Sequence, residues 1–331
     1  MKSALSKLFR FTAMKIFVLV FLLSLSGGCI SVHAQARLKL TIEGDKFFIN
    51  SQAKFFVFAS YFDALDAAYL ESDLNYLQAH CISGIRIFPN WWGNQTYSNH
   101  TLFDSLGHIR PERMKRLKTV LEAARAHGMI VDITFTHETV KGLDIAHYKK
   151  GIVRTVSKLK SYKYILYDLQ NERNGQRTYL SEKDIIALRG VLKSIQPGVI
   201  LSASEAYEAM PGEDSGFVSR TGMDVINYHE PRGGKWWNRT YSRAEELRTT
   251  GKPVYLGEPG RWKPGSSLIA ADLIRAITEA KKAGAAAWTF HSEASFYLDH
   301  TSLLSNLNPL VEQGFLDSLP AILQRTKWGD N

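Results

Sequence analysis

Short apolar runs alternate with longer amphipathic stretches along most of the chain. Eight of these runs have the length and the β-branched or aromatic content that is typical of buried strands. A shorter alternating stretch before them, residues 38–50, predicts a small β-hairpin. The eight predicted strands cover residues 54–62, 84–91, 129–137, 164–172, 199–206, 224–231, 253–260 and 285–293.

Helical patterns fill most of the gaps between these strands. Residues 111–128 begin with Pro111 and end with Gly128, which are the residues favoured at the two ends of a helix. Residues 181–195 and 267–284 show the same apolar periodicity. The segment between the fifth and sixth strands is short and rich in glycine, so no helix is predicted there.

Eight strands with a mean period of about 30 residues, separated mostly by helices, predict a (β/α)8 barrel. An open doubly wound sheet is the alternative, but such folds usually carry a glycine-rich phosphate turn after the first strand. The stretch "FASYFDALDA", residues 58–67, contains no glycine. No Pro/Ser-rich linker divides the chain, so we expect one domain over residues 35–331.

The first 34 residues predict a secretory signal peptide. Lys15 precedes an apolar run over residues 16–25, which is too short to span a bilayer as a helix, and small residues mark a cleavage point after Ala34. Lipid attachment at Cys29 is the alternative, although the residue three positions before it would normally be larger and aliphatic. We therefore expect a secreted or periplasmic protein.

The charge of the chain argues against one class of partner. Residues 1–34 contain four basic and no acidic residues, so their removal lowers the formal net charge from +9 to +5. The remaining charge is spread without a long Lys/Arg run, so no nucleic-acid partner is expected. No pattern in the sequence predicts a cofactor, a bound metal ion or an obligate protein partner.

Polar and aromatic side chains gather where the predicted strands end. In a (β/α)8 barrel, the carboxyl ends of the strands and the loops after them carry the active site. Tryptophan beside polar groups suits a ligand with both apolar faces and hydroxyls, which describes a sugar. On or just after the strands lie Arg86, Asn90, Trp91, Trp92, His137, Glu172, His229, Trp236, Trp237, Glu258, Trp262, Trp288 and His291.

Two of these residues are glutamates on strands that lie on opposite sides of the predicted barrel. Alternation along the fourth strand places Glu172 on the same face as Asp168, and alternation along the seventh places Glu258 on the same face as Leu256. Two carboxylates in one cleft match the acid and the nucleophile of glycoside hydrolysis. We expect the carboxyl groups to lie about 5–5.5 Å apart, as in retaining enzymes.

These motifs carry a resemblance to a known family. "YDLQNE" resembles the strand-four motif of clan A glycoside hydrolases, and "VYLGEPG" is similar to their strand-seven nucleophile motif. With "GIRIF" on the second strand and "AAWTF" on the eighth, the chain most resembles a divergent branch of glycoside hydrolase family 5, the cellulase and mannanase family. The resemblance implies a hydrolase for β-linked polysaccharide or oligosaccharide, such as an endo-β-glucanase or a β-mannanase.

The resemblance also implies roles for single residues. Glu172 would be the acid/base and Glu258 the nucleophile, with Arg86 holding Glu258 ionised. Asn171 would bind the 2-hydroxyl of the substrate, and Trp288 would form the floor beneath the attacked sugar. Together with the other strand-end residues, the expected substrate-binding set is Arg86, Asn90, Trp91, His137, Asn171, Tyr228, His229, Trp262 and Trp288.

One position departs from the family pattern. On the sixth strand the family has His-x-Tyr, but this chain has Pro231 two residues after His229. Tyr228 would replace the missing tyrosine only if the strand bulges. Glu230 and Arg232 are further charges to which the pattern assigns no role.

Two other functions remain open on sequence grounds. A metal-dependent barrel hydrolase would use the strand-end residues His137, His229 and His291, although the first strand carries no His-x-His. A non-catalytic sugar-binding barrel is the second alternative. Two buried acids argue against it, because a binding protein gains nothing from their desolvation cost. The sugar, the linkage and the choice between endo and exo cleavage do not follow from the sequence.

Overall fold

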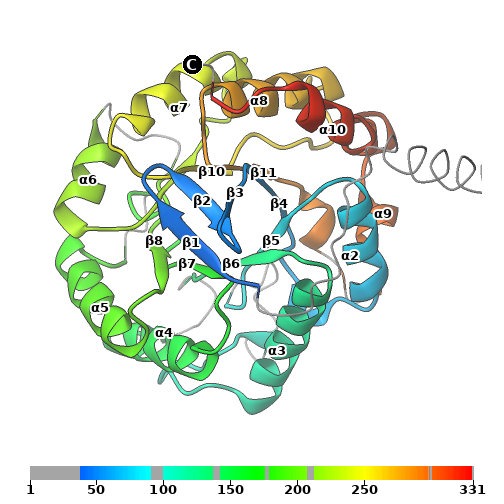
Figure 1. Ribbon diagram of the computed structural model, residues 1–331. Coiled ribbons are helices and arrows are strands. Elements are labelled where there is room, and N and C mark those ends of the chain that lie inside the picture. The colour runs from blue at the N-terminus through cyan, green and yellow to red at the C-terminus, as the bar shows by residue number, and fades with distance from the viewer. Residues whose placement is uncertain are drawn as a thin grey trace, which may run out of the picture. The chain divides into compact units, whose positions relative to one another are not determined.

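Eight parallel strands form the centre of the structure (Figure 1). The computed structural model describes residues 38–90, 100–136, 142–175, 179–206, 212–296, 298 and 300–329, all within the compact unit 34–331. A parallel bridge between Glu205, just after one end strand of the sheet, and Tyr228 of the other end strand closes the sheet into a barrel. In sheet order the strands are β8 (Ile200–Ser202), β7 (Ile165–Asp168), β6 (Ile130–Thr134), β5 (Gly84–Ile87), β4 (Phe56–Ser60), β11 (Ala287–Phe290), β10 (Val254–Glu258) and β9 (Ile226–His229).

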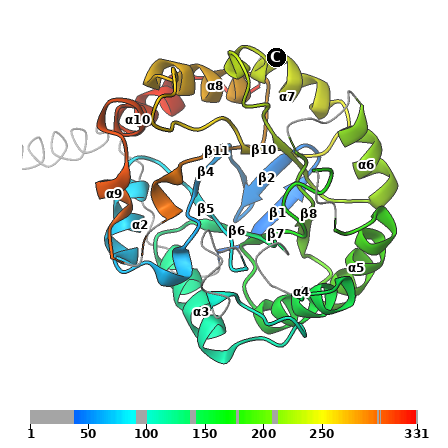
Figure 2. The ribbon, with the colours of Figure 1, turned by 180° about the vertical axis from the view of Figure 1, so that it is seen from behind.

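Helices follow the strands and form a ring outside the barrel (Figures 1 and 2). The predicted (β/α)8 barrel is confirmed, and each of the eight predicted strands is present within its predicted range. The helices are α2 (Leu70–Ala79), α3 (Pro111–Ala126), α4 (Ile145–Leu159), α5 (Glu182–Ile195), α6 (Glu213–Thr221), α7 (Thr240–Arg248), α8 (Ala270–Lys282), α9 (Leu303–Asn306) and α10 (Gly314–Arg325). Shorter helical turns are η1 (Ala64–Asp66), η3 (Trp236–Asn238), η4 (Glu293–Phe296) and η5 (Pro309–Gln313).

Helix α6 occupies the segment for which no helix was predicted. Gly212 stands immediately before it and Gly222 immediately after it, both in the left-handed conformation with φ of 80° and 69°. Glycine adopts this conformation without steric cost and commonly terminates helices. Phe217 and Val218 bury the inner face of the helix against the barrel. Two of the three glycines therefore bound a short helix, and the third, Gly216, is tolerated within it.

A small antiparallel sheet closes the amino-terminal end of the barrel, which faces the viewer in Figure 1. The predicted hairpin is confirmed as β1 (Leu40–Glu43) and β2 (Lys46–Ile49), and a third strand, β3 (Gln52–Ala53), extends it. The buried ring of Phe47 packs edge-on against Phe56 at 6.0 Å between centroids. Apolar packing thus seals this end, and the carboxyl ends of the barrel strands remain for a site.

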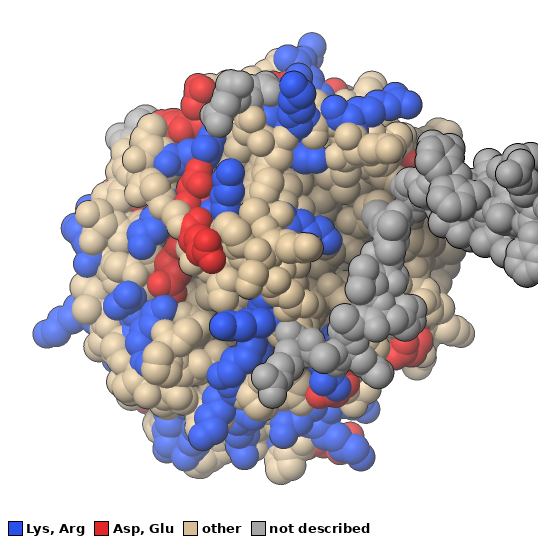
Figure 3. Space-filling model, viewed as in Figure 1, with Lys and Arg blue, Asp and Glu red and all other residues tan. Residues whose placement is uncertain are grey.

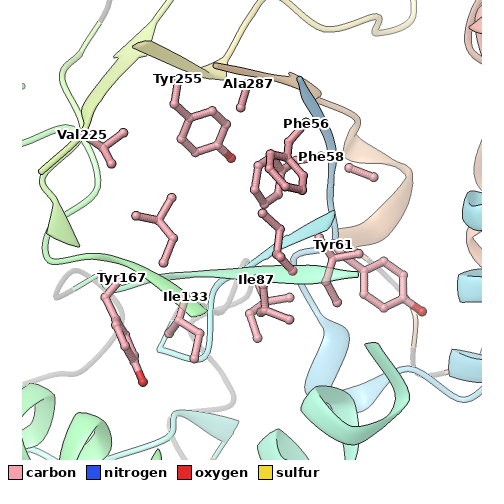
Figure 4. Packing of buried hydrophobic residues seen from close by; sticks show 14 of the residues in the cluster. Phe56, Phe58, Tyr61, Ile87, Ile133, Tyr167, Val225, Tyr255 and Ala287 are labelled. Carbon is pink, nitrogen blue, oxygen red and sulfur yellow. The ribbon is translucent and has the colours of Figure 1, made fainter. Parts of the chain in front are cut away.

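Aromatic rings also fill the lower interior of the barrel. Figure 4 shows Tyr255 and Phe58 inside the ring of strands, and their ring centroids are 4.9 Å apart. Ile133 and Tyr167 lie on the outer side of their strands, towards the helices (Figure 4). Because side chains alternate along a strand, these inward positions determine which side chains of each strand point to the open end of the barrel.

The predicted signal peptide, residues 1–34, and Cys29 within it lie outside the described residues. No helix in the described ranges combines the length and the apolar character needed to cross a membrane.

Candidate active site

Arg86 forms the base of the site. It stands on β5 with no exposed surface, opposite Asp132 of β6 in the strand ladder. Its Nε lies 3.2 Å from Asp132 Oδ2, and its Nη2 lies 3.3 Å from Asp168 Oδ2 on β7. Burial raises the pKa of Asp132 to about 7, although Arg86 opposes this shift. These two acids hold the guanidinium of Arg86 in place, because moving it away would leave buried charges without a partner.

Glu258 reaches the site through an irregularity in β10. Tyr255, not Leu256, takes the inward position (Figure 4), so simple alternation would turn Glu258 outward. The ladder with β9 shifts between Leu256 and Glu258, and this shift returns Glu258 to the mouth of the barrel. Gly257 permits the shift, because a Cβ there would lie only 2.0 Å from Asn227 Oδ1.

Guanidinium groups bind both oxygens of Glu258. Arg86 Nη1 donates to Oε1 at 2.6 Å, and Arg232 Nη2 donates to Oε2 at 2.5 Å. His229 Nδ1 and His291 Nε2 each lie 3.8 Å from Oε2. Burial alone would raise the pKa of Glu258, but the surrounding histidines and arginines outweigh it and hold the pKa well below its usual range. The carboxylate is therefore ionised at neutral pH.

The arginines supply the permanent part of this positive charge. Burial lowers the pKa of His291 well below its usual range, Glu258 opposes the shift, and three arginines led by Arg232 reinforce it. The Nε2 atom of His291 also lies 3.4 Å from Arg261 Nη1, which can only donate. His291 is therefore neutral at pH 7 and accepts a hydrogen bond there.

Glu172 reaches the same place from a turn. Strand β7 ends at Asp168, so its alternation does not extend to Glu172. Glu172 has φ of 51°, a left-handed conformation that is uncommon outside glycine and is often found at functional sites. Its backbone N–H donates to Ser204 Oγ at 3.0 Å. The turn also brings Asn171 inward, where its Oδ1 accepts from Arg86 Nη2 at 2.9 Å.

The carboxylate of Glu172 is the more open of the two. Its side chain is 33% exposed, against 6% for Glu258. Glu172 Oε1 lies 3.2 Å from His229 Nδ1, while Nε2 of the same ring lies 3.4 Å from Arg86 Nη2. Because a guanidinium only donates, Nε2 faces a donor, and Nδ1 is the ring nitrogen placed to donate to Glu172. Burial by itself would raise the pKa of Glu172, but the interaction with His229 leaves it lowered.

The two carboxylates and the imidazole between them converge closely. An oxygen of Glu172, an oxygen of Glu258 and a ring nitrogen of His229 all lie within 4.8 Å of one another. Within the described residues, this is the one group with atoms placed to surround a metal ion. Both oxygens of Glu258 already accept from guanidinium groups, however, so an ion there would lie against two fixed positive charges. Of the other two predicted ligands, His291 lies beside Glu258 and His137 lies outside the described residues.

Trp288 does not form the floor of the site, so the role predicted for it is wrong. Its ring is fully buried and packs against Phe315 of α10, with 5.6 Å between centroids. The inward residue of β11 is Thr289, whose Oγ1 donates to Tyr255 Oη at 3.0 Å. Alternation therefore directs Trp288 to the helices and brings His291, two residues beyond Thr289, into the site.

Tyr228 also points away from the site and does not replace the missing tyrosine. Its ring lies beneath Arg243 of α7, with 4.8 Å from the guanidinium carbon to the ring centroid. Arg232 takes the position on Oε2 of Glu258 instead. Sequence reasoning noted the charge of Arg232 but gave it no role. The one feature of the sequence that could have indicated a role for Arg232 is its position at a strand end, immediately after Pro231.

The remaining predicted binding residues lie in different surroundings. Asn90 is buried, and its Oδ1 accepts from the N–H of Leu102 at 3.0 Å, which ties down the chain after β5. Trp262 is half-buried and lines a cavity of about 190 Å³ together with Glu312. Trp91 and His137 lie outside the described residues. The structure thus gathers Arg86, Asn171, Glu172, His229, Glu258, Arg232 and His291.

Comparison with known proteins finds solved structures that have a similar fold. No family model and no curated protein match the sequence. The β-mannanase from the blue mussel Mytilus edulis has a similar structure, with a TM-score of 0.62 and 15% identity over 89% of this chain and 99% of that chain. The endo-1,4-β-mannanase from Eisenia fetida has a TM-score of 0.59 and 14% identity, covering 85% and 95% of the two chains.

A glycoside hydrolase family 5 enzyme from Prevotella bryantii B14 is also similar, with a TM-score of 0.59 and 12% identity over 81% of this chain and 96% of that chain. At such low identity, these similarities show the fold that the strand motifs implied. The chemistry has to be argued from the side chains at the mouth of the barrel.

Proposed function

We propose that the protein is a glycoside hydrolase that cleaves β-linked polysaccharide or oligosaccharide with retention of anomeric configuration. The observation that carries the proposal is the approach of Glu172 and Glu258 oxygens to within 4.8 Å. Retaining enzymes hold their carboxyl groups about 5–5.5 Å apart, whereas inverting enzymes need about 6.5–9.5 Å to admit a water. The short separation favours direct attack by one carboxylate.

Glu258 is the nucleophile in this mechanism. It is ionised, and Arg86 and Arg232 hold it in one orientation. One of its oxygens forms a bond to the anomeric carbon as the glycosidic carbon–oxygen bond breaks, which gives a glycosyl-enzyme ester. Water then attacks the same carbon and the ester bond breaks, so the configuration is inverted twice and retained overall.

Glu172 is the acid and then the base. It donates a proton to the leaving oxygen in the first step and takes one from water in the second. Its pKa is lowered in the free site by His229, but a bound sugar would cover its exposed surface, and burial favours the protonated form. The charge of Glu258 also raises the pKa of Glu172, and ester formation removes that charge. The same group can therefore hold a proton before the first step and release it afterwards.

Asn171 is placed to hold the sugar. Its Oδ1 accepts from Arg86, which fixes the amide so that its NH₂ group is directed elsewhere. In the proposed mechanism this NH₂ group donates to the 2-hydroxyl, a contact that strengthens in the transition state. Because five of the similar solved structures are named as mannanases, one of them also as an endo-β-glucanase, β-mannan and β-glucan oligosaccharides are suitable first substrates.

The test is the configuration of the first product. NMR spectra recorded early in hydrolysis, before mutarotation, should show the β-anomer. An α-anomer would mean that water attacks directly, and it would remove Glu258 from the role of nucleophile. Absence of turnover on every β-linked oligosaccharide would instead favour the non-catalytic sugar-binding protein.

We also propose that the protein is exported and that residues 1–34 are removed as a signal peptide. Support comes from Lys15, the apolar run after it and the small residues before Gln35. Amino-terminal sequencing of protein from its native host should begin at Gln35. A mature chain that begins at a lipid-modified Cys29 would establish anchoring instead.

A further inference from the structure

A cavity of about 820 Å³ opens beside the proposed site. One wall is the loop after β9 and η3, and the other is the segment after β10 with the first turns of α8, where α7 and α8 stand side by side (Figure 2). This volume is within the range of small-molecule sites, about 300–1,000 Å³. Arg232 joins the cavity to the site, because it lines the cavity and donates to Glu258 Oε2 at 2.5 Å.

Positive charge dominates the cavity wall. Among the described lining residues, Asp272 is the only acid, and its carboxylate accepts from the N–H of Ile269 at the start of α8. The basic lining residues are Arg232, Lys235, Arg261, Lys263 and Arg275.

Three of these basic side chains keep their charge available. Arg232 pairs with Glu258 and Arg261 with Glu293, but across the described ranges no ion pair involves Lys235, Lys263 or Arg275. All three of these residues are exposed. At the opposite end of the barrel, which Figure 3 shows, acidic side chains lie among the basic ones. Unpaired lysines also lie elsewhere on the described surface, Lys115 and Lys118 of α3 among them, but here three unpaired cations line a single cavity.

The floor of the cavity is aromatic. Trp236 and Trp237 line it, and they pack against each other at 85° with 5.7 Å between their ring centroids. Trp236 presses so closely on Gly260 that a Cβ there would lie 2.2 Å from the indole Nε1. Glycine is therefore required at position 260 for the indole to take this place. Indole rings beneath a basic rim suit a sugar ring that carries a negative group.

We propose that the substrate is an acidic glycan, and that a sugar bearing a carboxylate or a sulfate binds in this cavity, adjoining the sugar that Glu258 attacks. The inference rests on the proposed hydrolase function and narrows its substrate class. The unpaired Lys235, Lys263 and Arg275 bind the negative group, and Arg232 connects it to the reacting carboxylate. A neutral sugar in this cavity would desolvate these cations without supplying a negative group to pair with them, so it would bind less favourably.

The first experiment compares three sets of β-linked oligosaccharides of equal length: neutral, uronic-acid-containing and sulfated. One acidic set should be cleaved with a kcat/KM about tenfold or more above the neutral set, because charge-assisted hydrogen bonds are stronger than neutral ones. That advantage should shrink as sodium chloride is added. The set that is preferred identifies the anionic group, and equal or better cleavage of the neutral set would overturn the inference.

The second experiment alters the cavity. The double variant Lys263→Gln/Arg275→Gln should lose about tenfold or more in kcat/KM on the preferred acidic set, and clearly less on the neutral set. The matched control is Lys115→Gln/Lys118→Gln, which removes the same charge from exposed positions on α3. The control should leave both rates unchanged. Equal losses on both substrate sets in the cavity variant would contradict the inference.

Binding measurements separate this inference from the proposed function. Glu172→Gln protein, titrated calorimetrically, should bind the preferred acidic oligosaccharide more tightly than its neutral counterpart. If it does so while the wild-type protein cleaves nothing, the acidic-glycan site stands and the hydrolase proposal fails. If the wild-type protein cleaves neutral oligosaccharides and neither acidic set binds more tightly, the hydrolase stands and the acidic-glycan inference fails.

Discussion

The two glutamates of the proposed site are held in opposite ways. Glu258 ends a strand, is almost completely buried and has a guanidinium on each oxygen. Glu172 stands in a turn with a third of its side chain exposed, and among the described residues the imidazole of His229 is the one side chain that contacts its carboxylate within hydrogen-bond distance. A fixed and permanently charged carboxylate suits nucleophilic attack, whereas an open carboxylate beside a histidine suits proton exchange. The difference in surroundings therefore predicts different consequences when each glutamate is removed.

Neither glutamate reaches the site through regular strand geometry. Glu258 depends on the register shift that Gly257 allows, and Glu172 depends on a left-handed backbone conformation. Such irregularities cost stability and persist where the surrounding structure holds them. Ser204, just after β8, accepts from the backbone N–H of Glu172, and Gly257 packs closely on Asn227 of β9. The backbone at the ends of β7 and β10 therefore departs from regular strand geometry in the way that brings Glu172 and Glu258 into the site.

The largest effect is expected from Glu258→Ala. Without the nucleophile no glycosyl-enzyme forms, so kcat/KM should fall by about 10⁴-fold or more on every substrate, including those with activated leaving groups. Steady-state kinetics on natural and dinitrophenyl glycosides would measure this. Circular dichroism serves as the control for folding, because Arg86 still has Asp132 and Asp168 as partners. Near-wild-type rates in a folded variant would place the active site elsewhere.

Glu172→Ala should lose less activity than Glu258→Ala, and the size of the loss should depend on the leaving group of the substrate. On natural substrates the loss should be about 10²–10⁴-fold, the usual contribution of general acid–base catalysis. A dinitrophenolate needs no proton to leave, so the first step should still occur, and the glycosyl-enzyme should accumulate with a burst of product. Azide needs no general base, so it should restore turnover and yield a β-glycosyl azide.

The azide experiment is the sharpest test of the division between the two glutamates. Glu258→Ala provides the matched control, because it should give no burst and no β-glycosyl azide. If a folded Glu172→Ala protein is as inactive as Glu258→Ala on dinitrophenyl glycosides and azide does not rescue it, the roles assigned to the two residues are wrong.

A third glutamate allows the effect of charge to be separated from the effect of burial. Glu230 is as deeply buried as Glu258, but Thr240 Oγ1 donates to it at 2.8 Å where Glu258 has arginines. Burial raises the pKa of Glu230 to about 7. A raised pKa in the folded state means that the stability from this group is complete below about pH 4 and is lost as the pH rises through about 7.

Glu230→Gln should therefore stabilise the protein at pH 8 by about 2 kcal/mol and change little at pH 4, because glutamine never ionises. Glu258→Gln should behave in the opposite way. Its carboxylate has a depressed pKa, so its stabilising contribution is present at pH 8 and is lost in acid as the pH falls through the folded pKa. Denaturant unfolding at pH 8 and pH 4 measures the difference for Glu230, and a series continued below pH 4 measures the loss for Glu258. A Glu230→Gln effect that does not change with pH would contradict the raised pKa.

The fold could be predicted from the sequence because each strand is a short apolar run bounded by polar or turn-forming residues. This information is local, and it sufficed for all eight strands and for helices such as α3, with Pro111 at its start. Helix α6 was missed because glycine was interpreted as a helix breaker. In the structure Gly212 and Gly222 lie just outside the helix, where glycine favours its ends.

The site could be predicted only in part. Arg86, Asn171, Glu172, His229 and Glu258 meet because each stands near a strand end, and strand order alone brings strand ends together. The direction of a side chain depends instead on single-residue register. That register turned Trp288 and Tyr228 towards the helices. The path of the loop that delivers Arg232 to Glu258 depends on tertiary packing, which no local pattern specifies.

The smallest effect is expected from removing metal ions. A divalent ion among Glu172, His229 and Glu258 would have to displace Arg86 or Arg232 from Glu258, or lie beside both. Arg86 has no exposed surface and is paired with acids on two neighbouring strands, so it has no alternative position. We therefore expect dialysis against EDTA to leave kcat and KM unchanged on a dinitrophenyl glycoside, and metal analysis of the pure protein to find no stoichiometric ion.

An unchanged rate in EDTA would support the different roles proposed for the two glutamates. If arginines alone keep Glu258 ionised, a chelator removes nothing that either glutamate needs, and the rate stays the same for wild-type protein and for azide-rescued Glu172→Ala. Zinc added to the dialysed protein should also fail to raise the rate. Loss of activity in EDTA with recovery on zinc would mean that Glu172, His229 and Glu258 hold an ion. Glu258 would then be a ligand and not a nucleophile, and both glutamates would serve one purpose instead of two.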